Sequence, residues 1–150
     1  MTRDNRLSAV LHAILHLSEH DGPMTSEALA ACMRTNPVVV RRIMAGLREA
    51  GIVMASRGHG GGWALARPPS DTSLSDVHAA LGCPDLFGFG ASREPSACLL
   101  QQAVDAALEA ERQAAEARLL DRMKHIRLSD LAEDFGQRLA AHGKGHTHDL

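Results

Sequence analysis

The chain has 150 residues, of which 45% are hydrophobic, with three phenylalanines, one tryptophan and a formal net charge of −2. This length suits one compact domain or a domain with an appendage. The polar start MTRDNR predicts no secretory signal, and no apolar run approaches the roughly 18 residues of a membrane span. Three scattered cysteines do not form a disulfide framework. We therefore expect a cytoplasmic protein.

Charge is distributed unevenly along the sequence. Residues 1–67 contain eight arginines and five acidic residues, whereas residues 68–150 contain eight basic and thirteen acidic residues. Between Ala28 and Arg67, six arginines accompany a single acid, Glu49. A basic segment in an acidic chain predicts an anionic partner that binds this segment while the remainder is repelled.

Three helices are predicted before Gly51. The first ends at Gly22-Pro23 and has a hydrophobic face at helical spacing, formed by Leu7, Val10, Leu11, Ile14 and Leu17. A short second helix begins after a cap at Thr25 or Ser26. The third begins with Asn36 as its cap and Pro37 at its first position, and it ends at Gly51.

The segments that follow these helices have β character. IVMASRG and GGWALARP are two short strand-like runs separated by glycines. A helix-turn-helix followed directly by a β-hairpin is the winged-helix arrangement. We therefore predict a mainly α-helical fold with a small β-hairpin wing.

The glycines of RGHGGG supply the positive φ that a sharp hairpin tip needs, and they allow a close approach to a phosphate backbone. A nucleotide-binding loop is disfavoured, because a helix should follow its glycines and WALARPP is strand-like. For the glycines the alternative is a purely structural tight turn, and for Arg41 and Arg42 it is a solvent-exposed helix face without a DNA contact. The predicted DNA contacts are Thr35, Asn36, Val38, Arg41, Arg42, Arg57, Gly58, His59 and Gly60.

The second half of the chain is dominated by one long predicted helix, from Ala97 to about Arg127. It has a single apolar seam and is too long to cover one small domain, so we expect it to pair with a second copy of itself in a homodimer. A short capped helix in SLSDVHAALG and a glycine-rich loop precede it, and a short helix and a mobile tail follow it.

The run TNPVVVRRIMAGLREAGIVMASRGHGGGWALA, followed by TSLSDVHAALG, resembles the Rrf2 family of bacterial winged-helix regulators. The resemblance extends from about Leu7 to about His125, and it implies a dimeric transcription factor with a ligand or redox centre before its long helix. The predicted divisions are a winged helix-turn-helix domain (1–82), a sensor loop (83–96), dimerisation helices (97–141) and a flexible tail (142–150).

The cysteines depart from the pattern of family members that bind an iron–sulfur cluster. Those members have three closely spaced cysteines in the loop, whereas this loop has Cys83 and Cys98, fifteen positions apart. Since a cluster usually needs four ligands, we expect none, and no other cofactor. Cys98 should begin the long helix, whose dipole favours a thiolate, with Cys83 as a resolving thiol; simple packing is the alternative.

His12, His16 and His20 share one stripe of the first helix, a spacing that can bind metal, although we favour a stripe at a dimer contact without metal. No Ser-His-Asp set, carboxylate pair or cofactor fingerprint can be placed, so an enzyme is not expected.

The sequence thus predicts a homodimeric repressor that binds a palindromic operator in double-stranded DNA. The leading hypothesis for its signal is oxidation of Cys98. Two alternatives stay open: a regulator of the same fold that responds to a bound small molecule, and a helix pair that binds another protein.

Overall fold

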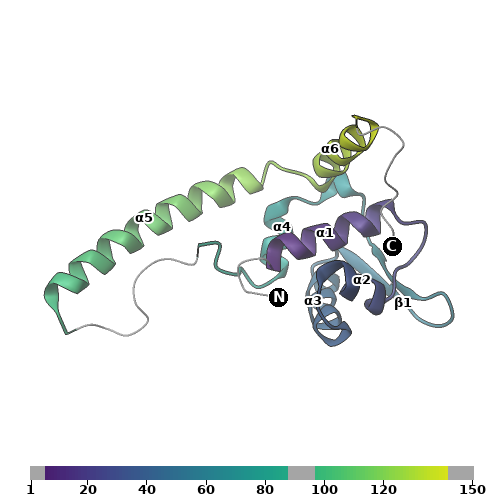
Figure 1. Ribbon diagram of the computed structural model, residues 1–150, viewed down its shortest axis with the longest axis horizontal. Coiled ribbons are helices and arrows are strands. Elements are labelled where there is room, and N and C mark those ends of the chain that lie inside the picture. The colour runs from purple at the N-terminus through teal and green to yellow at the C-terminus, as the bar shows by residue number, and fades with distance from the viewer. Residues whose placement is uncertain (1–5, 88–96, 142–150) are drawn as a thin grey trace.

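The computed structural model describes residues 6–87 and 97–141 of the chain. Their secondary structure is, in order, α1 (Arg6–Glu19), α2 (Ser26–Met33), α3 (Pro37–Glu49), β1 (Val53–Ser56), β2 (Gly62–Leu65), a 3-10 turn η2 (Pro69–Asp71), α4 (Leu74–Ala80), α5 (Leu99–Met123) and α6 (Leu128–Ala141). Helices α1–α4, the hairpin and α6 form a head from which α5 projects (Figure 1). This mainly helical architecture with a two-strand hairpin confirms the predicted fold class.

Of the two caps considered for α2, the structure has Thr25, and α3 has the predicted cap at Asn36. Thr25 Oγ1 accepts the backbone N–H of Ala28 at 3.2 Å, and Asn36 Oδ1 accepts that of Val39 at 3.0 Å. Each cap satisfies an amide that the start of a helix leaves unpaired. The turn between the two helices passes through Arg34, whose φ of +51° lies in the left-handed region. Caps and turn together fix where α3 begins relative to α2.

The head has a hydrophobic core to which α1, α2, α3, α4 and the first strand all contribute. Its most deeply buried large side chains include Val10, Ile14, Leu29, Val40, Met44, Leu47, Ile52, Val53 and Val77. Burying such a side chain contributes about 1.5–3 kcal/mol. This core therefore holds the short helices in place, because helices of this length have little stability of their own.

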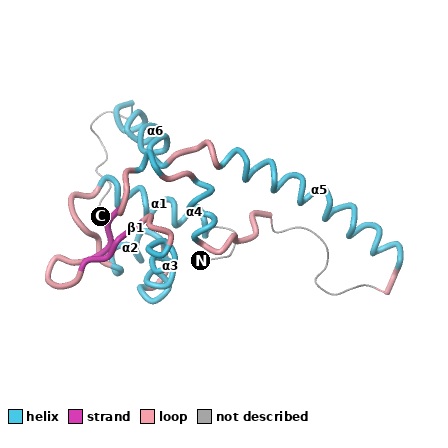
Figure 2. The backbone as a smooth tube through the Cα atoms, turned by 180° about the vertical axis from the view of Figure 1, so that it is seen from behind, coloured by secondary structure: helices cyan, strands magenta, loops and turns pink. Residues whose placement is uncertain are grey.

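The base of the hairpin is fixed to the start of α2. Strands β1 and β2 pair antiparallel, with Ser56 opposite Gly62 at the tip end. On the other side of β2, Met24 and Trp63 exchange two backbone hydrogen bonds of 2.9 and 2.8 Å. The indole Nε1–H of Trp63 donates to Ser26 Oγ at 3.1 Å. Beyond these contacts the tip extends away from the head (Figure 2).

Helix α6 packs on the head through its first residue and the residues just before it. Leu128 is 1% exposed in the core, and its N–H donates to the carbonyl of Thr72 at 2.9 Å. The N–H of Leu74 donates to the carbonyl of Ile126 at 2.9 Å. These hydrogen bonds join segments that are distant in the sequence, so helical periodicity alone does not indicate them.

Helix α5 has 25 residues, of which Met123 is the one buried side chain. At 1.5 Å per residue it is about 37 Å long. Its exposed large apolar side chains are Leu99, Leu100, Val104, Leu108 and Leu119. In the described part of the chain, no helix is both long and apolar enough to cross a membrane. The predicted tail (142–150) and residues 88–96 of the predicted sensor loop lie outside the described residues.

Candidate nucleic-acid interface

Helix α3 presents one buried and one exposed face. Its buried residues are Val40, Ile43, Met44 and Leu47. The opposite face therefore carries Val38, Arg41, Arg42 and Arg48, all exposed, with 62% of Val38 accessible. Val38 lies about one helical turn before Arg41 and Arg42, so its exposed apolar side chain belongs to the same face as these two arginines.

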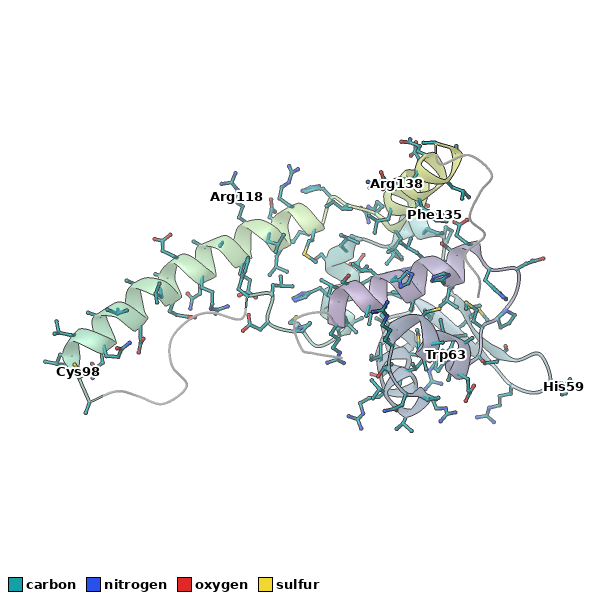
Figure 3. All side chains as sticks on the ribbon, in the orientation of Figure 1. His59, Trp63, Cys98, Arg118, Phe135 and Arg138 are labelled. Carbon is teal, nitrogen blue, oxygen red and sulfur yellow. The ribbon has the colours of Figure 1, made fainter. Side chains whose placement is uncertain are left out.

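The hairpin tip is exposed from Arg57 to Gly60. Gly58 and Gly60 have φ values of +92° and +79°, and no atom lies within 4 Å of where a side chain would start at either position. The positive φ predicted from the glycines is therefore present, in open space. Figure 3 shows His59 at the tip.

Helix α3 and the hairpin tip both lie on the side of the head away from α6 (Figures 1 and 2). We define the basic face as the exposed charged side chains of α2, α3, the turn between them and the hairpin tip, which are Glu27, Arg34, Arg41, Arg42, Arg48, Glu49 and Arg57. Five of these seven residues are arginines, so the uneven charge of the sequence becomes a local positive surface.

The structure gathers the predicted contact residues into two groups. Val38, Arg41 and Arg42 lie on α3, and Thr35 and Asn36 lie directly before it. Thr35 is half-buried, whereas Asn36 is exposed and its side-chain oxygen serves the helix cap. The second group, residues 57–60, forms the tip of the hairpin.

Sequence reasoning did not place Glu27 at this surface. Arg41 Nη2 lies 2.9 Å from Glu27 Oε1, and the two side chains are 56% and 64% exposed. The acid in the first turn of α2 was visible in the sequence, but its partner on the next helix was not. Arg34, in the turn, and Arg48, near the end of α3, also belong to the basic face and were not among the predicted contacts.

Cys83 and Cys98 are both exposed and are not brought together. Cys98 is the N-cap of α5, at the far end of the projecting helix (Figure 3). Cys83 directly precedes the Pro84–Asp85 segment, and Asp85 lies 3.7 Å from Arg112. Arg112 is fourteen residues after Cys98, about 20 Å further along the helix. A disulfide needs Cα atoms within about 7 Å of each other, so this arrangement does not permit one within a single chain.

Arg112 connects the segment after α4 to the long helix. It contacts Glu109 and Glu116 on α5, both at 2.8 Å, as well as Asp85. Hydrogen bonds from Arg112 and Gln113 lower the pKa of Glu109 to about 2. Hydrogen bonds to Glu109 and Glu116 raise the pKa of Arg112. This cluster places Asp85, which follows α4, beside the middle of α5.

The histidine stripe of α1 is only partly assembled. The Nε2 atoms of His12 and His16 are 2.9 Å apart, whereas the Nδ1 atom of His20 lies 3.0 Å from the carbonyl oxygen of Gly22. Over residues 6–87 and 97–141 no three His, Cys, Asp or Glu side chains are grouped so that they could hold a metal ion. With Cys83 and Cys98 also apart, the described donors do not fit an iron–sulfur cluster.

Comparison with known proteins agrees with this geometry. The model of the Rrf2 family, described as an iron-dependent transcriptional regulator, matches residues 3–134. YwnA of Bacillus subtilis, named as a candidate HTH-type transcriptional regulator, is 33% identical over 132 residues, which cover 82% of this chain and 98% of YwnA.

Solved structures with the same fold include a candidate transcriptional regulator from Lactobacillus plantarum, with a TM-score of 0.68 and 23% identity over 89% of this chain and 91% of that one. The global cysteine regulator CymR of Bacillus subtilis has a TM-score of 0.56 and 20% identity over 89% of this chain and 95% of CymR. At such low sequence identities, the structural similarity establishes the fold alone. The family model and YwnA, by contrast, match most of the sequence, and on their evidence the chain belongs to the Rrf2 family of transcriptional regulators.

Proposed function

We propose that the protein is a homodimeric repressor that inserts α3 into the major groove of a palindromic operator and places the hairpin tip beside it. The observation that supports this most directly is the basic face, because the arginine-rich helix α3 and the glycine tip are both on the side of the head away from α6. The acidic remainder of the chain would be repelled by DNA, which favours one orientation of the head on the duplex.

The residues of α3 and those of the hairpin tip have distinct roles in this proposal. Arg41 and Arg42 lie within the first two turns of α3 and can reach base edges, where arginine pairs with guanine. Val38 is suited to the methyl group of thymine. The backbone amides at the start of α3 face a phosphate, and Arg57 and His59 contact the backbone or the minor groove.

The second copy of the chain would cover the apolar side chains of α5. Leu100, Val104 and Leu108 are 79%, 51% and 45% exposed on a helix with one buried residue. Pairing of two such helices removes these side chains from water and holds two heads at a fixed separation. The two heads then require half-sites about one helical turn of DNA apart, or a multiple of that distance.

The signal is proposed to act at the start of α5. Cys98 is exposed at the N-cap of this helix, so a peroxide could oxidise its thiol to a sulfenic acid with release of water. A change at the end of a dimer helix can alter the separation of the heads. A small molecule bound before α5 is the alternative, and in either case the described donors favour a regulator without an iron–sulfur cluster. Peroxide should release DNA from the wild type but not from Cys98→Ser; equal release from both favours the small molecule.

Selection from a random pool of DNA duplexes tests the proposed function without knowledge of the operator. We expect the wild type to enrich an inverted repeat, to bind it as a dimer in sedimentation experiments and to lose affinity steeply with salt. Arg42→Ala should cost about 1–3 kcal/mol of binding free energy. Arg138→Ala, on α6 at the opposite side of the head, is the matched control and should cost nothing. A protein that enriches no sequence would contradict the proposal.

A further inference from the structure

The basic face contains an acid that is directly bound to one of its central arginines. Glu27 lies in the first turn of α2, and Arg41 lies in the second turn of α3. The contact between them, 2.9 Å from Nη2 to Oε1, is a charge-assisted hydrogen bond between two exposed side chains. Arg42, the next residue, makes no ion pair with any described residue. Arg41 and Arg42 are adjacent on one helix but are therefore in different electrostatic environments.

This difference affects what each arginine offers to DNA. A carboxylate beside Arg41 cancels much of its charge and itself repels phosphates, so the sequence-independent attraction of Arg41 to the backbone is reduced. The guanidinium has five N–H donors, and Glu27 accepts one of them. The remaining donors can still form the two parallel bonds that recognise a guanine edge. The contact also restrains a flexible side chain before binding, which lowers the entropic cost of using it.

We propose that Glu27 is a specificity-determining residue, which holds Arg41 for a base contact and suppresses its use as a general phosphate-binding cation. This inference rests on the proposed function, because it assigns a role within the same DNA-binding surface. Its effect is on the ratio between specific and non-specific affinity, which decides how well a regulator finds its site among many competing sequences.

The variant Glu27→Gln removes the negative charge and keeps the size of the side chain. Since Glu27 is exposed and is not the cap of α2, the fold should be retained. We expect affinity for a scrambled duplex to rise about three- to fivefold, as expected when a surface ion pair is removed. The salt dependence should steepen by about 0.9 in the slope of log affinity against log salt, which corresponds to one additional phosphate contact. Affinity for the selected duplex should stay unchanged or fall.

Glu49→Gln is the matched control, because Glu49 is the other acid of the basic face and the variant has the same net charge. Each protein is titrated, as a complete chain, with two duplexes of equal length: the sequence that the wild type enriches from a random pool, and a scrambled version. The double variant Glu27→Gln/Arg41→Gln should lose the gain in non-specific affinity, because the released arginine is absent.

The outcomes distinguish a failure of this inference from a failure of the proposed function. A larger loss of specificity in Glu27→Gln than in Glu49→Gln, abolished by Arg41→Gln, supports the inference. Equal changes in the two single variants would show a general effect of net charge and would overturn it. A wild type that enriches no sequence would instead overturn the proposed function, and with it this inference.

Discussion

Gly62, at the start of β2, is where a single methyl group should do most damage to the hairpin. A Cβ added there would collide with the backbone carbonyl of Met24, and the φ of +155° is one that L side chains rarely adopt. The collision falls on the backbone pairing of Met24 with Trp63, which fixes the hairpin to the head. Gly62→Ala should therefore displace the base of the hairpin.

Loss of the backbone pairing and strain at residue 62 together give the expected decrease in the free energy of unfolding of Gly62→Ala. The two Met24–Trp63 hydrogen bonds contribute about 1 kcal/mol each, and the backbone strain of alanine in this region adds about 1–3 kcal/mol. With partial relaxation we expect a loss of about 2–4 kcal/mol, a large part of the roughly 5–15 kcal/mol that stabilises a domain. Gly58→Ala is the control, because its φ of +92° is strained but nothing lies within 4 Å of the added methyl group. It should cost about 1–2 kcal/mol.

Urea unfolding followed by tryptophan fluorescence measures the loss of stability in both variants. Trp63 is the single tryptophan of the chain and its indole donates to Ser26 at the hairpin base, so its emission reports on this contact. Gly62→Ala should lower the free energy of unfolding and shift the emission of the native state. Gly58→Ala should leave the emission unchanged. Equal stability losses with identical native emission would refute the assignment of Gly62 as the anchor of the hairpin.

Two further predictions concern the turn of the helix-turn-helix and the long helix. Arg34 has a φ of +51°, so Arg34→Gly should relieve backbone strain, and thermal unfolding should show equal stability or a gain of up to about 1 kcal/mol. DNA binding by this variant should weaken because a cation is lost. A clear loss of stability would contradict the explanation that the turn is strained at Arg34. Because Arg112 and Gln113 lower the pKa of Glu109 from 4.5 to about 2, ionised Glu109 stabilises α5 above pH 4.5, and this contribution is lost as the pH falls towards 2. Circular dichroism should therefore show helix loss over this interval in the wild type and a smaller change in Arg112→Gln; identical profiles would contradict the prediction.

Local signals in the sequence determined most elements of the head. The caps at Thr25 and Asn36 and the periodic apolar faces predicted α1, α2 and α3, because a cap and a helical face depend on residues only three or four positions apart. The positive φ values of the hairpin glycines could also be predicted, because they depend on the residue type at single positions. The predicted contact residues on α3 and at the tip followed from these elements.

Tertiary structure decided the contacts between elements. The pairing of Glu27 with Arg41 and the position of α6 on the head each join residues that no periodic pattern relates. The separation of Cys83 from Cys98 likewise depends on how far the N-terminal end of α5 lies from the head. Such contacts arise from the packing of whole helices on a common core, whereas capping and periodicity act within one helix. The sequence therefore indicated which residues could face DNA, and the packing of α2 against α3 decided which arginine among them is held by a neighbouring acid.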